Sequence, residues 1–476
     1  MKENPYRQER EEMKELLRQY DNFKNGKKFK FIEEESFERI IDHFDESDNL
    51  PMALEAVNFA INQYAYSAPL LLKKADILIA MQDYIQALDV LTKAELLDSQ
   101  DINLYILKTD VYLALDNQEK AASILEEAIE TFVGPEKIEL LFELSDVYDD
   151  YEDFNKVFDC LRIILQQDPT NEEALYKICF WTDFTGRDEE SIQLHQEIID
   201  EHPYTQLAWF NLGAAYQGLK LYEKAIDSYL FAIAIDEKFD YAYRNLGDAY
   251  LRLRQYREAI EVLQKVLELT MPEAVIYEAI GHCYEKLKNP AQARFHYRKA
   301  SHLNVDDSHL YYKIAGTYMQ EGYWESAIKN LNNAISINRN QPDYQLALAE
   351  CFLELNHIKE AVIHFTQFIK ARPKNSKGWK ELIKCLFEAG YYEEALEQAH
   401  NASDNTNNKP LFTFYKAAIL FSLGKSKEGL IQLNNGIKDA PAMVKQFIEL
   451  DPSLLQRPAI AELISANKPV SKKKKK

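Results

Sequence analysis

The residues best placed for covalent chemistry are His282 and its neighbour Cys283. A Cys/His nucleophile needs an electropositive site that lowers the pKa of the thiol and orients the imidazole. Cys283 instead shares a register with Cys351 and Cys385, which follow it after 68 and 102 residues. Such recurrence is typical of a small apolar side chain in a repeated element. We therefore interpret Cys283 as a structural residue, with a thiol-dependent enzyme as the weaker alternative.

No other pattern in the sequence predicts catalysis. The phosphate-binding motifs G-x-x-x-x-G-K-[ST] and G-x-G-x-x-G are absent from it, as are H-E-x-x-H and C-x-x-C. The five cysteines form no close pair, which predicts reduced thiols rather than a disulfide framework. We expect a protein that is not an enzyme and that holds no cofactor or metal ion.

Carboxylates recur at a regular spacing in the N-terminal part of the chain. Asp42, Asp76, Asp110 and Asp146 follow one another after 34, 34 and 36 residues. Aligned carboxylates repel one another and are stabilised by cations, so this row predicts a surface for a segment rich in Lys or Arg. The alternative is a solvated acidic face in an acidic protein.

The same 34-residue period governs the apolar residues. Units begin at residues 34, 68, 102, 138, 172, 206, 240, 274, 308, 342, 376 and 410. Within a unit, positions 4, 7, 8 and 11 share one helical face, and positions 20, 24 and 27 share a second. Position 20 is alanine in nine of the twelve units. Each unit is predicted to be a helical hairpin that is narrow where small residues meet, and neighbouring hairpins must stack to bury their apolar faces.

The pattern Trp209-x-x-Leu212-Gly213-x-x-Tyr216, followed by Ala225-x-x-x-Tyr229, resembles the tetratricopeptide repeat. The resemblance covers about residues 34–443 and is strongest in the central units. It implies an all-α fold, a right-handed superhelical solenoid of antiparallel helix hairpins, that binds other proteins, usually along its concave surface. A related family of 35-residue helical repeats binds RNA, but the 34-residue period and the small residues favour the tetratricopeptide repeat.

By the same resemblance, positions 2, 5, 9 and 12 of each first helix line the concave groove. The candidate partner-binding residues at these positions are Glu38, Asp42, Asp76, Asp110, Phe142, Asp146, Tyr176, Phe180, Phe210, Tyr241 and Tyr312. Exposed aromatic side chains are common anchors of protein interfaces. Some family members bind chaperone tails through a clamp of Lys and Asn followed by Lys and Arg. No three successive units supply that clamp, which argues against a chaperone-tail adaptor.

The flanking segments differ from the array. Residues 1–33 include a charged helix, predicted over residues 6–20, that caps the array of residues 34–443. Residues 444–466 are predicted to form short capping helices, and residues 467–476 a disordered basic tail. Within the array, the third and fourth units are two residues further apart than the others, and the extra residues lie in residues 131–137. The polar residues 401–410 are expected to form a loop.

The charge of the chain indicates the class of partner. Its 77 acidic and 56 basic residues give a net charge of −21, which opposes binding to nucleic acid and to anionic membranes. The polar start and the lack of a long apolar run predict a cytoplasmic protein without a membrane span. We predict a non-enzymatic scaffold or adaptor that binds a protein or peptide, with a basic segment in its acidic N-terminal half. The alternative is an accessory subunit of an enzyme or regulatory complex whose activity resides in the partner.

Overall fold

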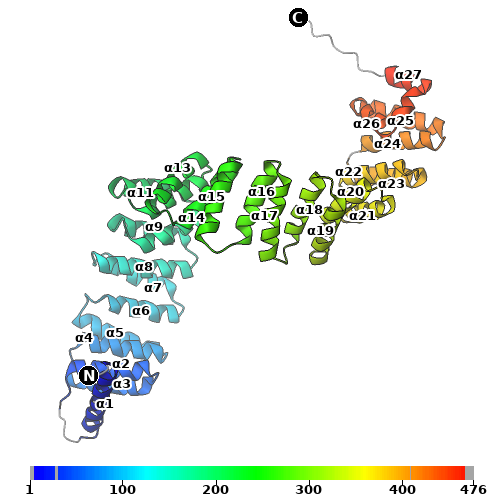
Figure 1. Cartoon of the computed structure of the whole chain (residues 1–476). Coiled ribbons are helices and arrows are strands. Elements are labelled where there is room, and N and C mark those ends of the chain that lie inside the picture. The colour runs from blue at the N-terminus through cyan, green and yellow to red at the C-terminus, as the bar shows by residue number, and fades with distance from the viewer. Residues whose placement is uncertain (1–4, 27–30, 408, 467–476) are drawn as a thin grey trace. The chain divides into compact units, whose positions relative to one another are not determined.

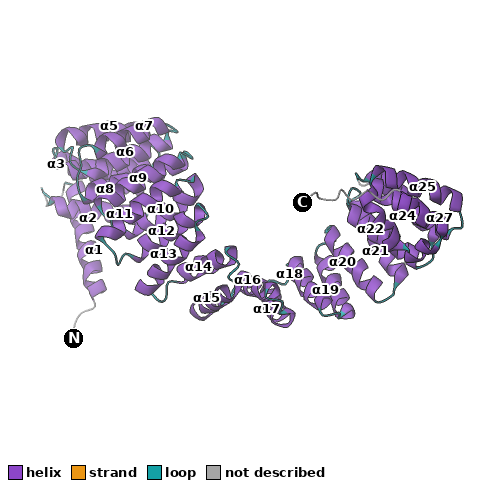
Figure 2. Ribbon diagram, turned by 90° about the horizontal axis from the view of Figure 1, so that it is seen from above, coloured by secondary structure: helices purple, strands orange, loops and turns teal. Residues whose placement is uncertain are grey.

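The computed structural model describes residues 5–26, 31–407 and 409–466. All regular elements in these residues are helical: α1 to α27 and two short 3-10 segments, with no strand (Figures 1 and 2). The chain divides into two compact units, Met1–Asn245 and Leu246–Lys476. Among the described residues, no helix combines the length and the apolar character needed to cross a bilayer.

In the first unit, α1 precedes six helical hairpins that follow one another along the chain (Figure 1). Each helix from α2 to α12 packs against the next one in sequence, and the first helices α4, α6 and α8 also touch one another in order. The helices are α1 (Pro5–Lys24), α2 (Glu34–Glu46), α3 (Leu50–Gln63), α4 (Ala68–Ala80), α5 (Tyr84–Leu97), α6 (Ile102–Ala114), α7 (Gln118–Ile129), α8 (Pro135–Asp150), α9 (Phe154–Gln167), α10 (Glu172–Thr185), α11 (Asp188–Glu201), α12 (Gln206–Gly218) and α13 (Tyr222–Ile235).

The boundary between the units falls within α14 (Asp240–Arg252). In the second unit the hairpins again pack on their neighbours in sequence, and α24 and α25 carry the last short helices. These elements are α15 (Tyr256–Leu269), α16 (Ala274–Lys286), α17 (Pro290–Leu303), α18 (Ser308–Gln320), α19 (Trp324–Ile337), α20 (Pro342–Glu354), α21 (Ile358–Ala371), α22 (Ser376–Glu388), α23 (Tyr392–Asn405), α24 (Lys409–Ser422), α25 (Ser426–Asp439), η1 (Pro441–Met443), α26 (Val444–Leu450), η2 (Pro452–Gln456) and α27 (Pro458–Ala466).

A residue in the left-handed conformation joins the two helices of every hairpin. It stands at position 15 of each predicted unit, with φ between 55° and 78° at Asp48, Gln82, Asp116, Glu152, Gly186, Lys220, Arg254, Lys288, Gly322, Asn356, Gly390 and Gly424. At the second hairpin, the N–H of Gln82 donates to Ile79 and that of Asp83 to Leu78, both over 2.8 Å. This pattern satisfies the last carbonyls of the first helix and reverses the chain. The twelve turns confirm the predicted period.

Small residues allow the two helices of a hairpin to approach closely, as predicted. Position 20 is buried in all twelve units, including Ala225, Ala259 and Ala327. A Cβ atom on Gly213, at position 8, would lie 2.6 Å from the ring of Tyr229, at position 24. The large residue at position 24 therefore covers the small one at position 8, and any side chain there would displace it.

The ends of the array are covered by apolar contacts. On α1, the ring of Tyr20 is fully buried, and its centroid lies 6.1 to 6.4 Å from those of Phe37, Phe44 and Phe59. At the other end, α26 packs on α24, and α27 packs on α25. The predicted basic tail, residues 467–476, lies outside the described residues.

Two predicted connections differ from the structure. Residues 401–405, expected in a loop, continue α23, because Ala399, Ala402 and Ser403 keep a buried helical face despite the polar sequence. Of the insertion at residues 131–137, the last three residues belong to α8, which begins at Pro135 after Gly134 in a left-handed conformation. The extra residues therefore lengthen the first helix of that hairpin.

Candidate functional site

The first helices of the N-terminal hairpins carry a continuous row of carboxylates. Asp42, Asp76, Asp110 and Asp146 lie on α2, α4, α6 and α8. Burial raises the pKa of Asp76, and the carboxylate of Asp45 raises it further. Burial also raises the pKa of Asp110, with a contribution from Asp76. Asp76 and Asp110 therefore each experience the charge of a carboxylate on the preceding first helix, and at Asp76 the ammonium of Lys73 opposes this rise in pKa.

Lysines neutralise the two outer aspartates of this row. The ammonium of Lys73, on α4, pairs with the carboxylate of Asp42. The ammonium of Lys177, on α10, lies 3.6 Å from a carboxylate oxygen of Asp146. Both lysines occupy position 6 of the unit that follows their partner. Position 6 of the next unit thus decides whether a position-9 carboxylate is paired.

The two inner aspartates have no such partner. Position 6 of the next unit is Leu107 for Asp76 and Glu143 for Asp110. Neither aspartate forms an ion pair or side-chain hydrogen bond with any residue in the described part of the chain. Burial, Asp146 and Asp110 raise the pKa of Glu143. We call Asp76, Asp110 and Glu143 the acidic stripe.

The other two predicted residues in this region, Glu38 and Phe142, are less accessible to a ligand. Glu38 lies one turn before Asp42 on α2 and is half-buried. Phe142, on α8, is also half-buried, and the ammonium of Lys177 lies 5.1 Å from its ring centroid. Because a lysine already covers part of this ring, Phe142 offers less surface to a ligand than the sequence predicted.

An exposed aromatic patch follows on α10. The predicted anchors Tyr176 and Phe180 are 64% and 60% exposed, and Phe184, one turn further, is 57% exposed. The ring of Trp181 stacks on Phe154 with a centroid distance of 5.1 Å, and Phe154 lies 4.7 Å from Phe184. We call these five residues the aromatic patch. Phe154, Trp181 and Phe184 were not predicted, although the four-residue spacing of Tyr176, Phe180 and Phe184 places these three rings on one helical face.

The remaining predicted anchors do not join this patch. Phe210, on α12, is half-buried, because its ring packs 5.1 Å from Phe239 and 5.8 Å from Tyr229. Tyr241, on α14, is 53% exposed. Tyr312 lies on α18 in the second unit and is half-buried. Phe210 therefore contributes to packing rather than to an exposed surface.

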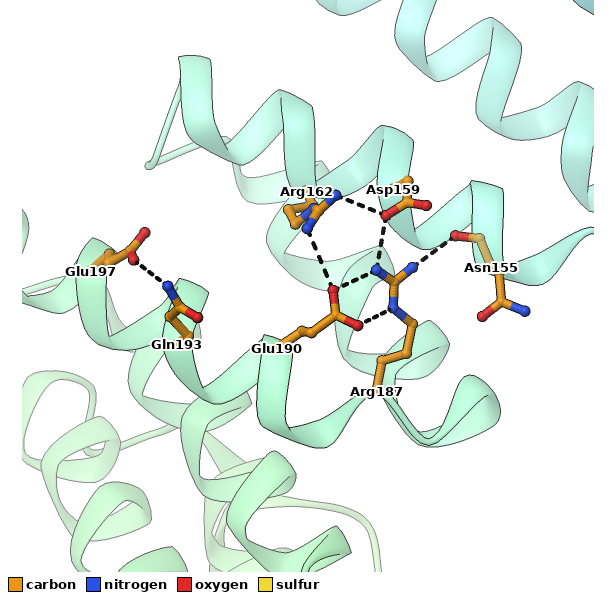
Figure 3. A network of polar contacts seen from close by, with 7 residues as sticks. All are labelled: Asn155, Asp159, Arg162, Arg187, Glu190, Gln193 and Glu197. Carbon is orange, nitrogen blue, oxygen red and sulfur yellow. Dashed lines mark hydrogen bonds and ion pairs between the residues drawn. The ribbon is translucent and has the colours of Figure 1, made fainter.

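A second polar cluster joins α9 and α11 (Figure 3). The guanidinium of Arg187 donates to Glu190 over 2.8 Å, to Asp159 over 2.9 Å and to the carbonyl of Asn155 over 3.1 Å. Arg162 lies 3.0 Å from Asp159 and 3.4 Å from Glu190. Hydrogen bonds from Arg187 lower the pKa of Glu190. Two cations thus balance two carboxylates, and this cluster links second helices rather than presenting free charge.

The thiols do not have the environment of a nucleophile. Cys283 is fully buried, and burial raises the pKa of its thiol to about 11. Burial likewise raises the pKa of Cys351 to about 12 and of Cys385 to about 11. These thiols therefore stay protonated at neutral pH. The described residues contain no group of three or more His, Cys, Asp and Glu side chains placed to hold a metal ion.

Comparison with known families identifies the hairpins. Family models described as tetratricopeptide repeats match residues 207–239, 240–271, 274–304 and 308–341. The chain is a tetratricopeptide-repeat protein. A further model, described as the TT21 fifth ARM repeats domain, matches residues 342–447. In the structure, this tetratricopeptide-repeat protein has hairpins with left-handed turns at Asn356, Gly390 and Gly424 in that region as well.

Solved structures with detectable similarity are distant in sequence. The tetratricopeptide-repeat protein YrrB, described with an unusual peptide-binding site, is 18% identical over 39% of this chain and 95% of its own, with a TM-score of 0.35. The APC/C hetero-tetramer Cut9–Hcn1 is 14% identical over 82% of this chain and 90% of its own, with a TM-score of 0.34. The C-terminal part of a TPR repeat-containing protein from Cytophaga hutchinsonii is 13% identical over 54% of this chain and 99% of its own, with a TM-score of 0.44.

Proposed function

We propose that this tetratricopeptide-repeat protein is a non-enzymatic scaffold that binds a basic segment of a partner protein on the first-helix faces of its first unit. Tetratricopeptide repeats are protein-interaction modules. The observation that carries the proposal is that Asp76, Asp110 and Glu143 form no ion pair within the described residues and have raised pKa values. The aspartates at the same position of the neighbouring units, Asp42 and Asp146, are paired. Mutual repulsion makes this arrangement unfavourable alone and favourable with a cationic ligand.

The aromatic patch extends the same surface. Lys177 connects the two regions, because it approaches Asp146 on α8 and Glu173 on its own helix, α10. Tyr176 and Phe180 lie on the same helix and present exposed rings. Rings beside carboxylates suit the side chains of Arg and Lys, which pair with the carboxylates and stack on the rings. The favoured ligand therefore places several cations over α4 to α8 and a further cationic or apolar side chain over α10.

The test removes the unpaired charges only. We expect the triple variant Asp76→Asn/Asp110→Asn/Glu143→Gln to bind a fluorescein-labelled peptide of alternating Lys and Ser at least about tenfold more weakly than wild type. The control Glu119→Gln/Glu189→Gln/Glu201→Gln removes the same charge from exposed sites on α7 and α11 and should bind like wild type. Fluorescence anisotropy gives both affinities.

Capture from native cell extract then identifies the natural partner. A partner that is retained by the wild type and by the control, but lost from the triple variant, supports a basic ligand of the acidic stripe. Equal loss in both variants would contradict the proposal, because it would make the effect one of net charge alone. If the captured partner is an enzyme whose rate changes on binding, the accessory-subunit alternative is favoured.

A further inference from the structure

A pocket on the second unit has Gly316 in its lining. It lies among the first helices α16, α18, α20 and α22 and has a volume of about 500 Å³. A Cβ atom on Gly316 would meet no atom within 4 Å, whereas one on Gly281 would lie 2.6 Å from the ring of Tyr297. Gly281 is therefore required by helix packing, but Gly316 is not. Its missing side chain instead opens the surface of α18.

Part of the pocket lining is apolar. Met319 on α18 and Leu346 and Ala347 on α20 line it beside Gly316. The half-buried ring of Tyr312 forms one wall and is held between Tyr344 and His309, with centroid distances of 5.1 and 5.9 Å. The stacked contact with His309 and the tilted contact with Tyr344 hold the ring of Tyr312 in place, so this wall is ordered before a ligand binds.

The rim carries charges of both signs that are already paired. Lys313 lies 2.6 Å from Glu278, Lys377 lies 3.2 Å from Glu350, and Arg372 lies 3.1 Å from Asp343. The carboxylate of Glu285 accepts a hydrogen bond of 2.7 Å from the hydroxyl of Tyr297. Any ligand that enters meets both lysines and the three carboxylates of this rim, and four of these five groups already have an ion-pair partner, so a charged ligand gains little net attraction. The electrostatics of the rim therefore favour a neutral ligand over either charge.

The lining residues also indicate a polypeptide ligand. They occupy positions 2, 5, 6, 9 and 12 of four successive first helices, so the pocket is part of a face that continues from helix to helix. An extended segment lying across these helices can insert one side chain while its peptide groups reach the polar rim. Burial and the nearby Lys286 and Lys313 lower the pKa of His282, which leaves a neutral imidazole to hydrogen-bond such a backbone.

We propose that this pocket binds a single large apolar side chain, Leu, Met or Phe, of an extended partner segment. The inference rests on the proposed function only in treating first-helix faces as binding surfaces. It assigns a different ligand chemistry to the second unit from that proposed for the first. The triple variant of the acidic stripe leaves this pocket unchanged, so the two tests fail independently.

The experiment uses the full chain labelled with ¹³C-methyl methionine. The probes are the blocked peptides acetyl-Ser-Ser-Phe-Ser-Ser-amide and its analogues with Lys or Glu in place of Phe. We expect the Phe peptide to shift the methyl signal of Met319, assigned with Met319→Leu, and to leave that of the exposed Met271 in place. The Lys and Glu peptides should bind at least about tenfold more weakly.

A substitution that fills the pocket tests the proposal, and the same side chain added elsewhere is its control. Gly316→Leu should abolish the response to the Phe peptide without lowering the melting temperature, because the added side chain enters open space and leucine favours a helix more than glycine. Asn332→Leu, exposed on α19, adds the same side chain elsewhere and should bind like wild type. The proposal is overturned if no peptide shifts Met319, if a charged peptide binds as tightly, or if Gly316→Leu retains binding.

Discussion

At the scale of single residues, the same turn is made by very different side chains. Position 15 requires a positive φ in every hairpin, yet it is Gly in some units and Lys or Arg in others. A left-handed conformation costs a non-glycine residue about 1–2 kcal/mol, and glycine loses part of that advantage through its greater freedom in the unfolded chain. Turns with Lys or Arg are therefore maintained by the helices that they join rather than by their own preference.

Because the cost of a left-handed conformation exceeds the entropic cost of glycine, replacing a non-glycine residue at position 15 by glycine should stabilise the fold. Lys220→Gly, at φ 61° with an exposed side chain, should raise the free energy of unfolding by about 0.5–1 kcal/mol. Gly186→Lys, at the same position of the preceding unit and with open space around its Cβ, should lower it by a similar amount. Urea unfolding of the two variants measures both effects. Equal stability of all three proteins would show that this turn is not strained.

At the scale of helices, a buried histidine connects three of them. The Nδ1 of His195, on α11, donates to the carbonyl of Ser191 over 2.7 Å, and its Nε2 accepts from the amide of Asn211, on α12, over 3.2 Å. The same amide donates to the carbonyl of Leu175, on α10, over 2.7 Å. Burial lowers the pKa of His195 from 6.5 to about 4. The folded state therefore holds a neutral imidazole where the unfolded chain would bind a proton.

The sign of the pH dependence follows from this difference. Below pH 6.5 the unfolded chain binds a proton that the folded state resists, so stability is complete above that pH and falls as the pH drops towards 4. The loss should reach about 3 kcal/mol. Urea unfolding between pH 7 and pH 4 measures it in the wild type and in His195→Gln. A variant with the same pH slope as the wild type would assign acid sensitivity to other groups.

At the scale of the molecule, contacts run almost entirely between neighbours in sequence, so a local defect should have local effects. Ala225→Leu inserts bulk at a fully buried helix crossing and should cost about 1–3 kcal/mol. Hydrogen exchange should then accelerate in α12 and α13 and remain unchanged in α2 to α5. Uniform acceleration along the first unit would instead indicate one cooperative folding unit.

The same locality explains how much the sequence could predict. The period, the hairpins and the small residues at the helix crossings depend on contacts within or between adjacent units, and the spacing of Ala225 and Gly213 encodes them directly. Which of the position-9 aspartates form ion pairs was not predicted. The pairing depends on whether position 6 of the next first helix is Lys73, Leu107 or Glu143. The Gly316 pocket was also missed: position 9 puts Gly316 on the predicted groove face, but the space around it depends on how the side chains of three neighbouring first helices are arranged.

The left-handed turns have one further consequence. All twelve position-15 residues are exposed, and they follow a fixed backbone geometry that accepts acidic, basic, amide and glycine side chains. These exposed turns are therefore suitable sites for insertions, fluorophores or epitope tags. A change at a turn alters neither the crossing between the two helices nor the exposed face of the first helix. A set of reporters placed at successive turns would mark each hairpin separately along the whole array.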